Sequence, residues 1–191
     1  MKKKHLLLKN MQKDIDRMNV LISDISSYTL TQVEIDKELF YSFDVIEFLK
    51  DFLEPYFTNS KNIKINFEFE RNTSIINANK DKLAQVFSNL IDNSLSYSPQ
   101  NSAILIEQKT TDKDVIISFF DQGPGVNPEL KNKIFERFYT DREVNQDKHT
   151  GLGLSIAKKI IETFSGSLEL NNVKSKKYFG ACFTIVLPLI D

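Results

Sequence analysis

Apolar residues recur at alternating steps of three and four positions near the start of the chain, with charged or polar residues between most of them. They are Leu8, Met11, Ile15, Met18, Ile22 and Ile25. This spacing predicts a long amphipathic helix whose apolar stripe packs against another helix. Because an isolated helix of this kind is only marginally stable in water, we expect it to pair with a second helix or with another copy of itself. Packing of the helix on its own domain is the alternative.

Beyond residue 38 the pattern changes to shorter elements of both kinds. Strong helical periodicity predicts helices at 79–97 and 151–164, and Asp44 is placed to cap a third helix that ends near residue 57. Apolar runs, alternating or β-branched, predict strands at 39–43, 63–70, 75–76, 102–109, 115–121, 167–173 and 179–187. Because these elements lack βαβ regularity, we expect an α+β fold, a two-layer α/β sandwich with helices on one face of a mixed, mostly antiparallel sheet.

Two less regular stretches separate these elements. The polar residues 29–38 are typical of a linker, so we divide the chain into a helical segment with its linker at 1–37 and a compact domain at 38–191. Residues 126–150 contain only short helical patterns and end in the polar tract 141–149. A loosely patterned segment of this length inside a compact domain is typical of a functional lid or of disorder.

Composition narrows the class of protein. The chain has 191 residues, of which 41% are hydrophobic and 15 are Phe, enough for a substantial core. A formal net charge of -1 gives no support for nucleic-acid binding. The single cysteine, Cys182, excludes a disulfide framework and fits core packing. Since no apolar run approaches the roughly 18 residues of a membrane span, we expect a cytoplasmic chain that meets a membrane only through an anchored parent chain.

The first candidate for chemistry is a carboxylate that precedes a glycine pair. Asp121 stands at the end of the predicted strand 115–121, after its apolar run 115–120, and Gly123 and Gly125 follow it closely. Glycines permit a sharp turn and let a planar ring approach the backbone, while a carboxylate oxygen accepts a hydrogen bond from an exocyclic amine. Adenine has such an amine. By itself the motif also fits an ordinary turn at the end of a strand.

Two further motifs favour a nucleotide site. Asn89 and Asn93 lie four residues apart on one face of the predicted helix 79–97, a face that Gln85 and Tyr97 share. The second glycine motif opens the predicted helix 151–164 and consists of Thr150, Gly151, Leu152, Gly153 and Leu154. Free backbone N–H groups at a helix start bind anions such as phosphate.

Together these motifs resemble the catalytic and ATP-binding domain of two-component sensor histidine kinases. This family belongs to an ATPase superfamily with gyrase-type topoisomerases, heat-shock chaperones and mismatch-repair proteins. The resemblance lies in QVFSNLIDNSLSYSP (N box), DQGPGV (first glycine box), IFERFYT (phenylalanine box), TGLGLSIAKKII (second glycine box) and the final strand GACFTIVLP. It implies a Bergerat-type ATP-binding fold. The leading helix resembles the second helix of the family's dimerisation and phosphoacceptor hairpin, which implies a homodimer through that helix.

The resemblance also implies roles for residues near the base and the metal. Asp121 would accept the adenine amine, with Gly123 and Gly125 giving the ring close access. Asn93 would offer an oxygen to Mg²⁺, and Asn89 would support the metal, its waters or the phosphates. Tyr97 is a candidate to cover the nucleotide.

At the phosphate end, the second glycine box would hold the β- and γ-phosphates. Its members here are Gly151, Leu152, Gly153 and Leu154, and Thr150 would add a hydroxyl. Arg137 would meet phosphate or the partner domain. Phe135 and Phe138 would anchor the lid against the core, and lid movement would couple ATP binding to docking of the acceptor helix.

Asn89 favours phosphoryl transfer over hydrolysis. Hydrolytic relatives carry a glutamate at its place as general base, and an amide cannot accept a proton at neutral pH. The resemblance therefore implies a protein-histidine kinase that moves the ATP γ-phosphate to a histidine, for relay to a response regulator. The alternatives are an ATP-binding interaction module without catalysis and an anti-sigma-type serine kinase.

Two departures from the family bear on this hypothesis. Neither His5 nor His149 has the sequence neighbourhood of the family's phosphoacceptor, so we expect this chain to bind ATP without phosphorylating itself. The acceptor would come from a helix of the parent chain. Ser96 stands where the family usually has Lys or Arg in contact with phosphate; Arg137, Arg142 or Lys148 could supply that contact instead.

Overall fold

The computed structural model describes residues 40–59, 64–70, 73–140, 150–173 and 178–190, with the isolated positions 11, 12, 15, 18 and 22. The linker, both histidines and most of the predicted N-terminal helix lie outside the described residues, and so does the pairing of that helix. Four of its predicted stripe residues are described, and all are exposed: Met11, Ile15, Met18 and Ile22.

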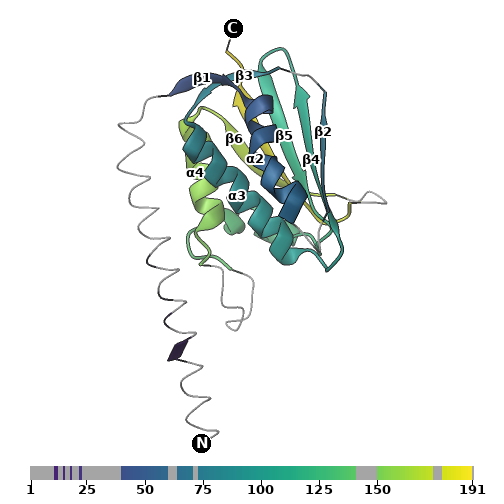
Figure 1. The fold of residues 1–191 in the computed structure, drawn as a ribbon. Coiled ribbons are helices and arrows are strands. Elements are labelled where there is room, and N and C mark those ends of the chain that lie inside the picture. The colour runs from purple at the N-terminus through teal and green to yellow at the C-terminus, as the bar shows by residue number, and fades with distance from the viewer. Residues whose placement is uncertain are drawn as a thin grey trace, which may run out of the picture.

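Within the described residues, five strands form one mixed sheet (Figure 1). In spatial order they are β2 (Lys64–Phe69), β4 (Ala103–Thr110), β5 (Asp114–Phe120), β7 (Ala181–Pro188) and β6 (Ser167–Asn172). Strand β2 runs parallel to β4, and the remaining neighbours are antiparallel. The predicted mixed, mostly antiparallel sheet is confirmed.

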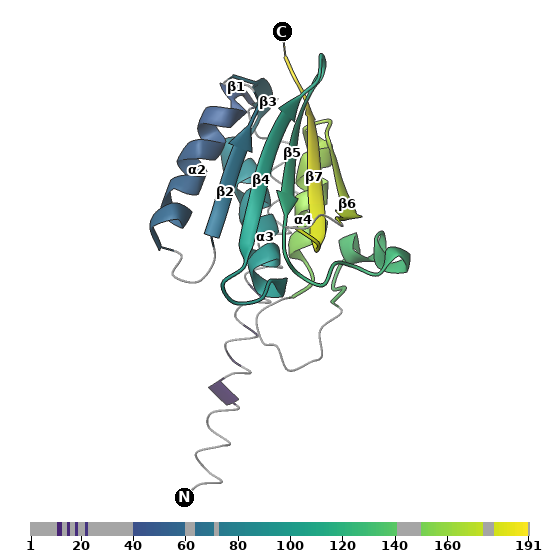
Figure 2. The ribbon, with the colours of Figure 1, turned by 90° about the vertical axis from the view of Figure 1, so that its right-hand side faces the viewer.

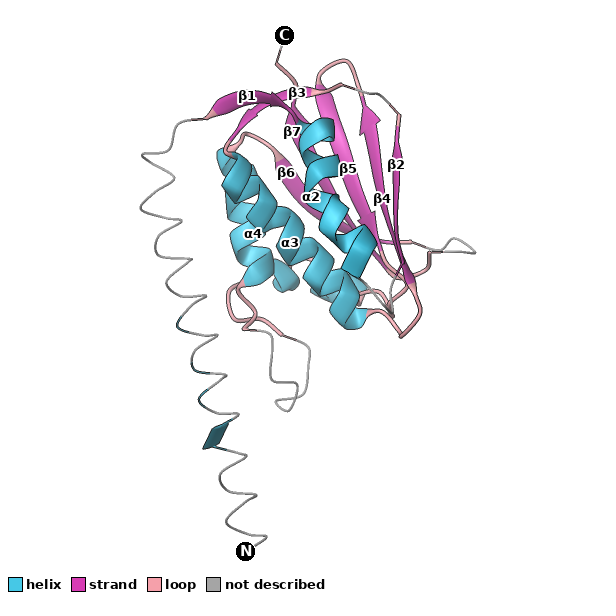
Figure 3. Ribbon diagram, in the orientation of Figure 1, coloured by secondary structure: helices cyan, strands magenta, loops and turns pink. Residues whose placement is uncertain are grey.

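The helices α2 (Val45–Asn59), α3 (Lys80–Tyr97) and α4 (Gly153–Thr163) cover one face of this sheet, as Figure 3 shows. Figure 2 shows the strands from the side that these helices leave open. A separate ribbon pairs β1 (Tyr41–Asp44) with β3 (Ile75–Ala78) in antiparallel register. The expected two-layer α+β architecture is therefore present in the described residues.

Local capping explains where two of the helices begin. The Asp44 side chain accepts hydrogen bonds from the backbone N–H of Ile46 at 2.9 Å and of Ser74 at 3.1 Å. At α3, Asn79 accepts from Lys82 N at 3.0 Å. Such caps satisfy backbone donors that have no partner within the helix. Both helix starts agree with the sequence prediction.

Two predictions for the segment between β5 and α4 are wrong. The helix predicted from residue 151 begins at Gly153, because Gly151 has a left-handed backbone with φ 73°. Phe138 does not anchor this segment, since its side chain is 59% exposed. Phe135 packs against the core at the end of the short 3-10 helix η2 (Lys133–Phe135), which follows another 3-10 helix, η1 (Pro128–Leu130).

The core fills the space between the helices and the sheet. Phe87 on α3 and Phe119 on β5 are fully buried, with ring centroids 5.9 Å apart. This contact ties α3 to the middle of the sheet. The antiparallel register of β5 and β7 places Phe120 opposite Cys182, so the end of β5 lies beside the start of β7. No helix in the described part of the chain combines the length and apolarity that a bilayer span requires.

Candidate functional site

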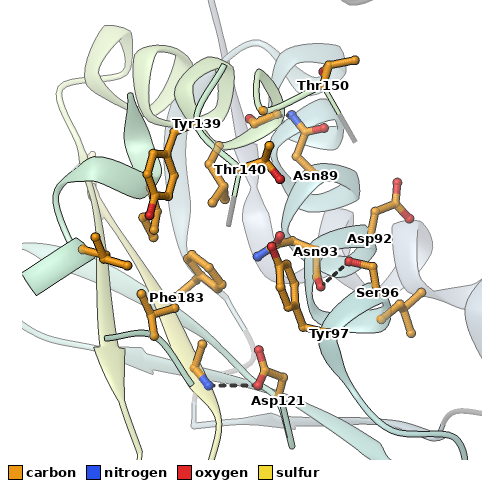
Figure 4. A pocket seen from close by; sticks show the side chains of 18 of the residues that line it. Asn89, Asp92, Asn93, Ser96, Tyr97, Asp121, Tyr139, Thr140, Thr150 and Phe183 are labelled. Atoms are coloured by element: carbon orange, nitrogen blue, oxygen red, sulfur yellow. Dashed lines mark hydrogen bonds between the residues drawn. The ribbon is translucent and has the colours of Figure 1, made fainter. Parts of the chain in front are cut away.

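A cavity of about 590 Å³ opens beside α3 (Figure 4). Its walls come from α3, the loop after β5, the segment that follows it, the start of α4 and the start of β7. Asp121 lies at one end of the labelled side chains in Figure 4, and Asn89 and Thr150 lie at the other. The three polar motifs of the sequence therefore meet around one cavity.

Asp121 is held rigidly by backbone groups. Its side chain is almost fully buried, and Oδ1 accepts hydrogen bonds from Gly123 N and Ala181 N, each at 2.9 Å. Burial raises the pKa of this carboxyl above its usual value, and the two hydrogen bonds only partly oppose that rise. Both recorded bonds use Oδ1, which leaves Oδ2 as the acceptor for a ligand in the cavity.

Two glycines make room for that carboxylate. A side-chain carbon at Gly180 would collide with Asp121 Oδ1 and would lie 2.6 Å from Gly123 N. One at Gly123 would lie 3.1 Å from both Asp121 Oδ1 and Tyr97 O. Gly123, which was expected to give the ring access, is not among the residues that line the cavity, whereas Gly125 lines it and has a left-handed φ of 74°. The sequence analysis included Gly180 only in the final strand motif and did not predict that it contributes to the site.

The α3 wall presents amides. Asn89, Asn93 and Gln85 all line the cavity from one face of the helix. Asn89 Nδ2 donates to Gly153 O at 3.1 Å, so this side chain joins α3 to the start of α4. Its Oδ1 is left to accept from a ligand or to contact a cation. Gln85 shares the predicted face but was given no role in the sequence analysis.

The start of α4 closes the opposite end. Thr150, Gly151, Gly153 and Leu154 line the cavity, and the Thr150 hydroxyl accepts a long hydrogen bond of 3.4 Å from Leu152 N. The first N–H groups of an α-helix have no partner within it and carry partial positive charge. This end of the cavity can therefore bind an anion.

Not all of the residues that the sequence predicted for the site line the cavity. Tyr97 lines the cavity, and Figure 4 shows it between Asn93 and Asp121. Leu152 is 1% exposed and belongs to the core beneath the glycine box. Arg137 is exposed and lies outside the lining residues of the cavity.

Comparison with protein families places this cavity in a known group. The profile described as histidine kinase-, DNA gyrase B- and HSP90-like ATPase matches residues 78–191. The chain belongs to this family. The match contains every cavity-lining residue, from α3 through β7.

Similar members of this ATPase family include sensor proteins. The chain is 32% identical to the sensor protein ChvG of Rhizobium meliloti (strain 1021), over 97% of the chain and 34% of that protein. It thus spans about a third of the length of the sensor proteins it matches.

Solved structures of histidine kinases have the same fold. The catalytic domain of the histidine kinase ThkA aligns with a TM-score of 0.67 and 28% identity, over 79% of this chain and 98% of that one. A structure of ThkA in complex with the response regulator protein TrrA aligns with a TM-score of 0.71 and 25% identity, over 94% and 49% of the two chains.

The cavity also includes residues to which the sequence analysis assigned no contact with the nucleotide, although all of them except Leu130 lie within the motifs quoted there. They are Asp92, Leu95, Ser96, Pro124, Val126, Leu130, Ile134, Tyr139, Thr140, Ile156, Ala181 and Phe183. Many are apolar and suit contact with a planar base. Phe183 comes from β7 and Ile156 from α4, so only the packing of these elements on α3 brings them to the cavity.

The oxygen atoms in the cavity wall fit a hard cation that is bound jointly by the protein and by phosphate groups of a ligand. No group of three or more His, Cys, Asp or Glu within the described residues is placed to hold a metal ion. The α3 wall instead offers amide oxygens from Asn89 and Asn93. Mg²⁺ prefers oxygen ligands, keeps several waters and often binds through few protein groups plus substrate phosphates. The residues present fit Mg²⁺ bound in that way.

Proposed function

We propose that this chain is the ATP-binding catalytic part of a sensor histidine kinase. It binds ATP with Mg²⁺ and transfers the γ-phosphate to a histidine on a helix that this chain does not supply. The observation that carries the proposal is a single cavity with a backbone-held carboxylate at one end and a helix start at the other. Membership of the ATPase family and similarity to sensor proteins support it.

In this proposal the buried carboxylate selects the base. Asp121 Oδ2 accepts the adenine amine, and Gly125, Tyr97 and Phe183 enclose the ring. Guanine presents a carbonyl at the corresponding position, which would leave the carboxylate facing another acceptor. Buried polar groups without partners are costly, so the contact rejects guanine.

The opposite end holds the phosphates. The start of α4, with Gly151, Gly153 and Leu154, supplies backbone N–H donors, and Thr150 adds a hydroxyl. Asn93 and Asn89 orient the metal complex through their amide oxygens. The bound Mg²⁺ supplies charge neutralisation for phosphoryl transfer, which otherwise depends mainly on alignment.

The wall is poorly suited to activating water. Asn89 is an amide, and its Nδ2 is engaged by Gly153 O. The described lining contains two carboxyl groups, Asp121 and Asp92. Asp121 lies at the base end, and Figure 4 shows Asp92 directed away from Tyr139 and Phe183 on the far wall. Transfer to a nucleophile brought from elsewhere is therefore favoured over hydrolysis.

The proposed partners follow from the same assignment. ThkA, a relative by fold and sequence, was crystallised with a response regulator, and we propose a response regulator as the downstream partner here. Exposed Met11, Ile15, Met18 and Ile22 support a homodimer through the N-terminal helix. We place the chain in the cytoplasm, with any membrane anchor in a parent chain.

A phosphotransfer assay tests this function. The chain is mixed with the phosphoacceptor hairpin of its full-length parent, labelled ATP and Mg²⁺. Acid-labile label on the hairpin histidine is the expected result, and Asp121→Asn should abolish it. Acid-stable label would indicate a serine kinase, while ATP binding without any label would indicate an interaction module. Absence of both binding and label would refute the proposal.

A further inference from the structure

The loop that leads from β5 to η1 is held to the sheet at both of its ends. At its start, Asp121 Oδ1 accepts a hydrogen bond from Ala181 N on β7. At its end, the side chain of Asn172 on β6 bonds the backbone of Val126. The register of β6 and β7 pairs Asn172 with Ala181, so both attachments lie at the same level of the sheet.

At the second attachment, one side-chain amide pairs with both backbone groups of a single residue. Asn172 Oδ1 accepts from Val126 N at 2.9 Å, and Asn172 Nδ2 donates to Val126 O. A side-chain amide can do this because it carries an acceptor and a donor side by side. Figure 2 shows the end of β6 beside the green segment that follows β5. Val126 lines the cavity and Asn172 is not among the lining residues.

Gly125 provides the space in which this amide lies. A side-chain carbon at Gly125 would lie 3.1 Å from Asn172 Oδ1 and 3.4 Å from Asn172 Cγ. The first distance is shorter than ordinary van der Waals contact, so a larger residue would push the amide away from Val126. The left-handed φ of 74° also favours glycine at this position. Gly125 therefore serves the contact with Asn172 as well as access to the cavity.

We infer that Asn172 is a positioning residue for the base end of the cavity, an inference that rests on the proposed function. It acts through the backbone of Val126 and keeps Gly125 and Val126 in the conformation that encloses adenine. Without the amide, the loop samples other conformations, and the apparent dissociation constant increases as the binding-competent fraction falls. Because every adenosine nucleotide uses this wall, the loss affects adenosine and Mg-ATP by the same factor.

Asn172→Ala tests this role. Calorimetry, at a temperature where denaturation shows the variant to be folded, should give about tenfold weaker binding of both adenosine and Mg-ATP. In the phosphotransfer assay with the hairpin of the parent chain, KM for ATP should increase by a similar factor with kcat unchanged, as expected for a contact that holds substrate and transition state equally. Unchanged affinities, or a decrease in kcat with KM unchanged, would overturn the inference.

Asn171→Ala is the matched control, because it removes the same side chain from the preceding position of β6. Asn171 Oδ1 accepts from Lys131 Nζ at 3.2 Å, a contact with a flexible side chain instead of the cavity wall. Its adenosine affinity should equal that of the unmodified chain. Equal weakening by Asn171→Ala and Asn172→Ala would refute a specific role for Asn172.

Asn172→Asp separates hydrogen bonding from shape. It keeps the size of the side chain and the acceptor for Val126 N, but it places an acceptor where a donor faced Val126 O. Adenosine, which carries no charge, should therefore bind more weakly than to the unmodified chain. Full adenosine affinity in this variant would show that the paired bonds do not position the wall.

A double-mutant cycle tests the contact between Gly125 and Asn172. Gly125→Ala displaces the amide, so adding Asn172→Ala should weaken adenosine binding by less than the product of the two single effects. Independent effects that multiply would refute this contact.

Hydrogen exchange tests the attachment without any variant. In the nucleotide-free, unmodified chain, the Val126 amide should exchange more slowly than an unprotected amide, because it donates to Asn172. Exchange at the unprotected rate would overturn the inference, whether or not the variants fold.

Failure of the inference and failure of the proposed function give different results. If the unmodified chain and Asn172→Ala bind adenosine equally well, only the inference fails. If the unmodified chain binds neither adenosine nor Mg-ATP, the nucleotide site itself is refuted and both fail.

Discussion

The two ends of the cavity are built in different ways. At the base end, Asp121 is almost fully buried, and backbone groups from its own loop and from β7 hold its Oδ1. At the phosphate end, the amides of α3 and the start of α4 are only half-buried, and Asn89 joins them through one recorded side-chain hydrogen bond. In the proposed function, selection of the base therefore depends on the loop after β5 and its contact with β7, whereas the phosphate end depends on the junction of two helices.

Because of this difference, we expect substitutions at the two ends to have different effects on folding and binding. A group held by its own loop and by the start of β7 cannot move without disturbing the main chain around it, so changes there should affect folding and binding together. A helix junction can adjust locally, so changes there should affect phosphate contacts with little effect on the fold. The following predictions test this contrast, from the largest expected effect to the smallest.

Gly180→Ala should have the largest effect. The added carbon would collide with Asp121 Oδ1 and crowd Gly123 N at the β5–β7 junction. Overpacking of this kind typically costs about 1–3 kcal/mol. We expect a corresponding decrease in the free energy of unfolding, measured by urea denaturation, together with loss of adenosine binding.

Gly153→Ala is the matched control for that substitution. The three atoms nearest to its added carbon all belong to the Asn89 side chain, at ordinary contact distances from 3.4 Å. The free energy of unfolding should therefore stay close to that of the unmodified chain. Equal destabilisation by both substitutions would contradict the contrast between the two ends.

Asp121→Asn should abolish base selection while preserving the fold. The amide retains an oxygen that accepts from Gly123 N and Ala181 N, but it loses the charged acceptor for adenine. Hydrogen bonds to charged groups contribute about 1.5–3 kcal/mol, so the dissociation constant for ADP should increase by at least about tenfold. Calorimetry measures the binding and denaturation measures the fold.

Asp112→Asn is the control for loss of a carboxylate, because Asp112 is exposed in the β4–β5 turn. It should bind ADP as the unmodified chain does. If Asp121→Asn binds ADP as tightly as the unmodified chain does, Asp121 does not contact the base.

Asn89→Ala should affect binding at the phosphate end of the cavity without affecting binding at the base end. It removes the hydrogen bond to Gly153 O, whose net contribution is about 1 kcal/mol. We expect weaker Mg-ATP binding and unchanged adenosine binding in parallel titrations. Asn77→Ala, on β3 away from the cavity, should change neither. Equal weakening of adenosine and Mg-ATP by Asn89→Ala would show that the two ends are not independent.

The smallest effect is on the pH dependence of stability. Burial raises the pKa of Asp121 in the folded chain, so the folded state binds this proton more tightly than the unfolded state. This group therefore makes the free energy of unfolding decrease as pH rises from the unfolded pKa of about 4 through the raised folded pKa.

Comparison with Asp121→Asn isolates that contribution. The stability of the unmodified chain minus that of Asp121→Asn should decrease across this pH window and then level off. ADP affinity should change in the opposite sense and decrease as the carboxyl is protonated. A constant stability difference would show that the carboxyl is not perturbed.

Much of the molecule could be predicted from local sequence patterns. Asp44 caps α2 as the sequence predicted, Asn79 lies at the predicted start of α3, and β5 ends directly before Asp121 as its apolar run indicated. Asn89 and Asn93 share a helical face that lines the cavity. These features depend on residues within one or two helical turns or one strand, where spacing and capping act directly.

Other features depended on contacts between distant segments. Asp121 and Ala181 are 60 positions apart, and the β5–β7 register alone brings Ala181 N to the carboxylate and Gly180 beside it. Phe183 and Ile156 reach the cavity only because β7 and α4 pack around α3. The left-handed backbone of Gly151 likewise reflects its place against Phe138 and Tyr139.

The sequence by itself determined which elements form and which side chains carry the candidate chemistry, because periodicity, caps and glycine motifs act over short distances. The tertiary structure decided which atom of Asp121 remains for a ligand, which glycine leaves room for this side chain and which distant residues line the cavity. Those properties arise from burial and from groups that only strand pairing and helix packing bring together.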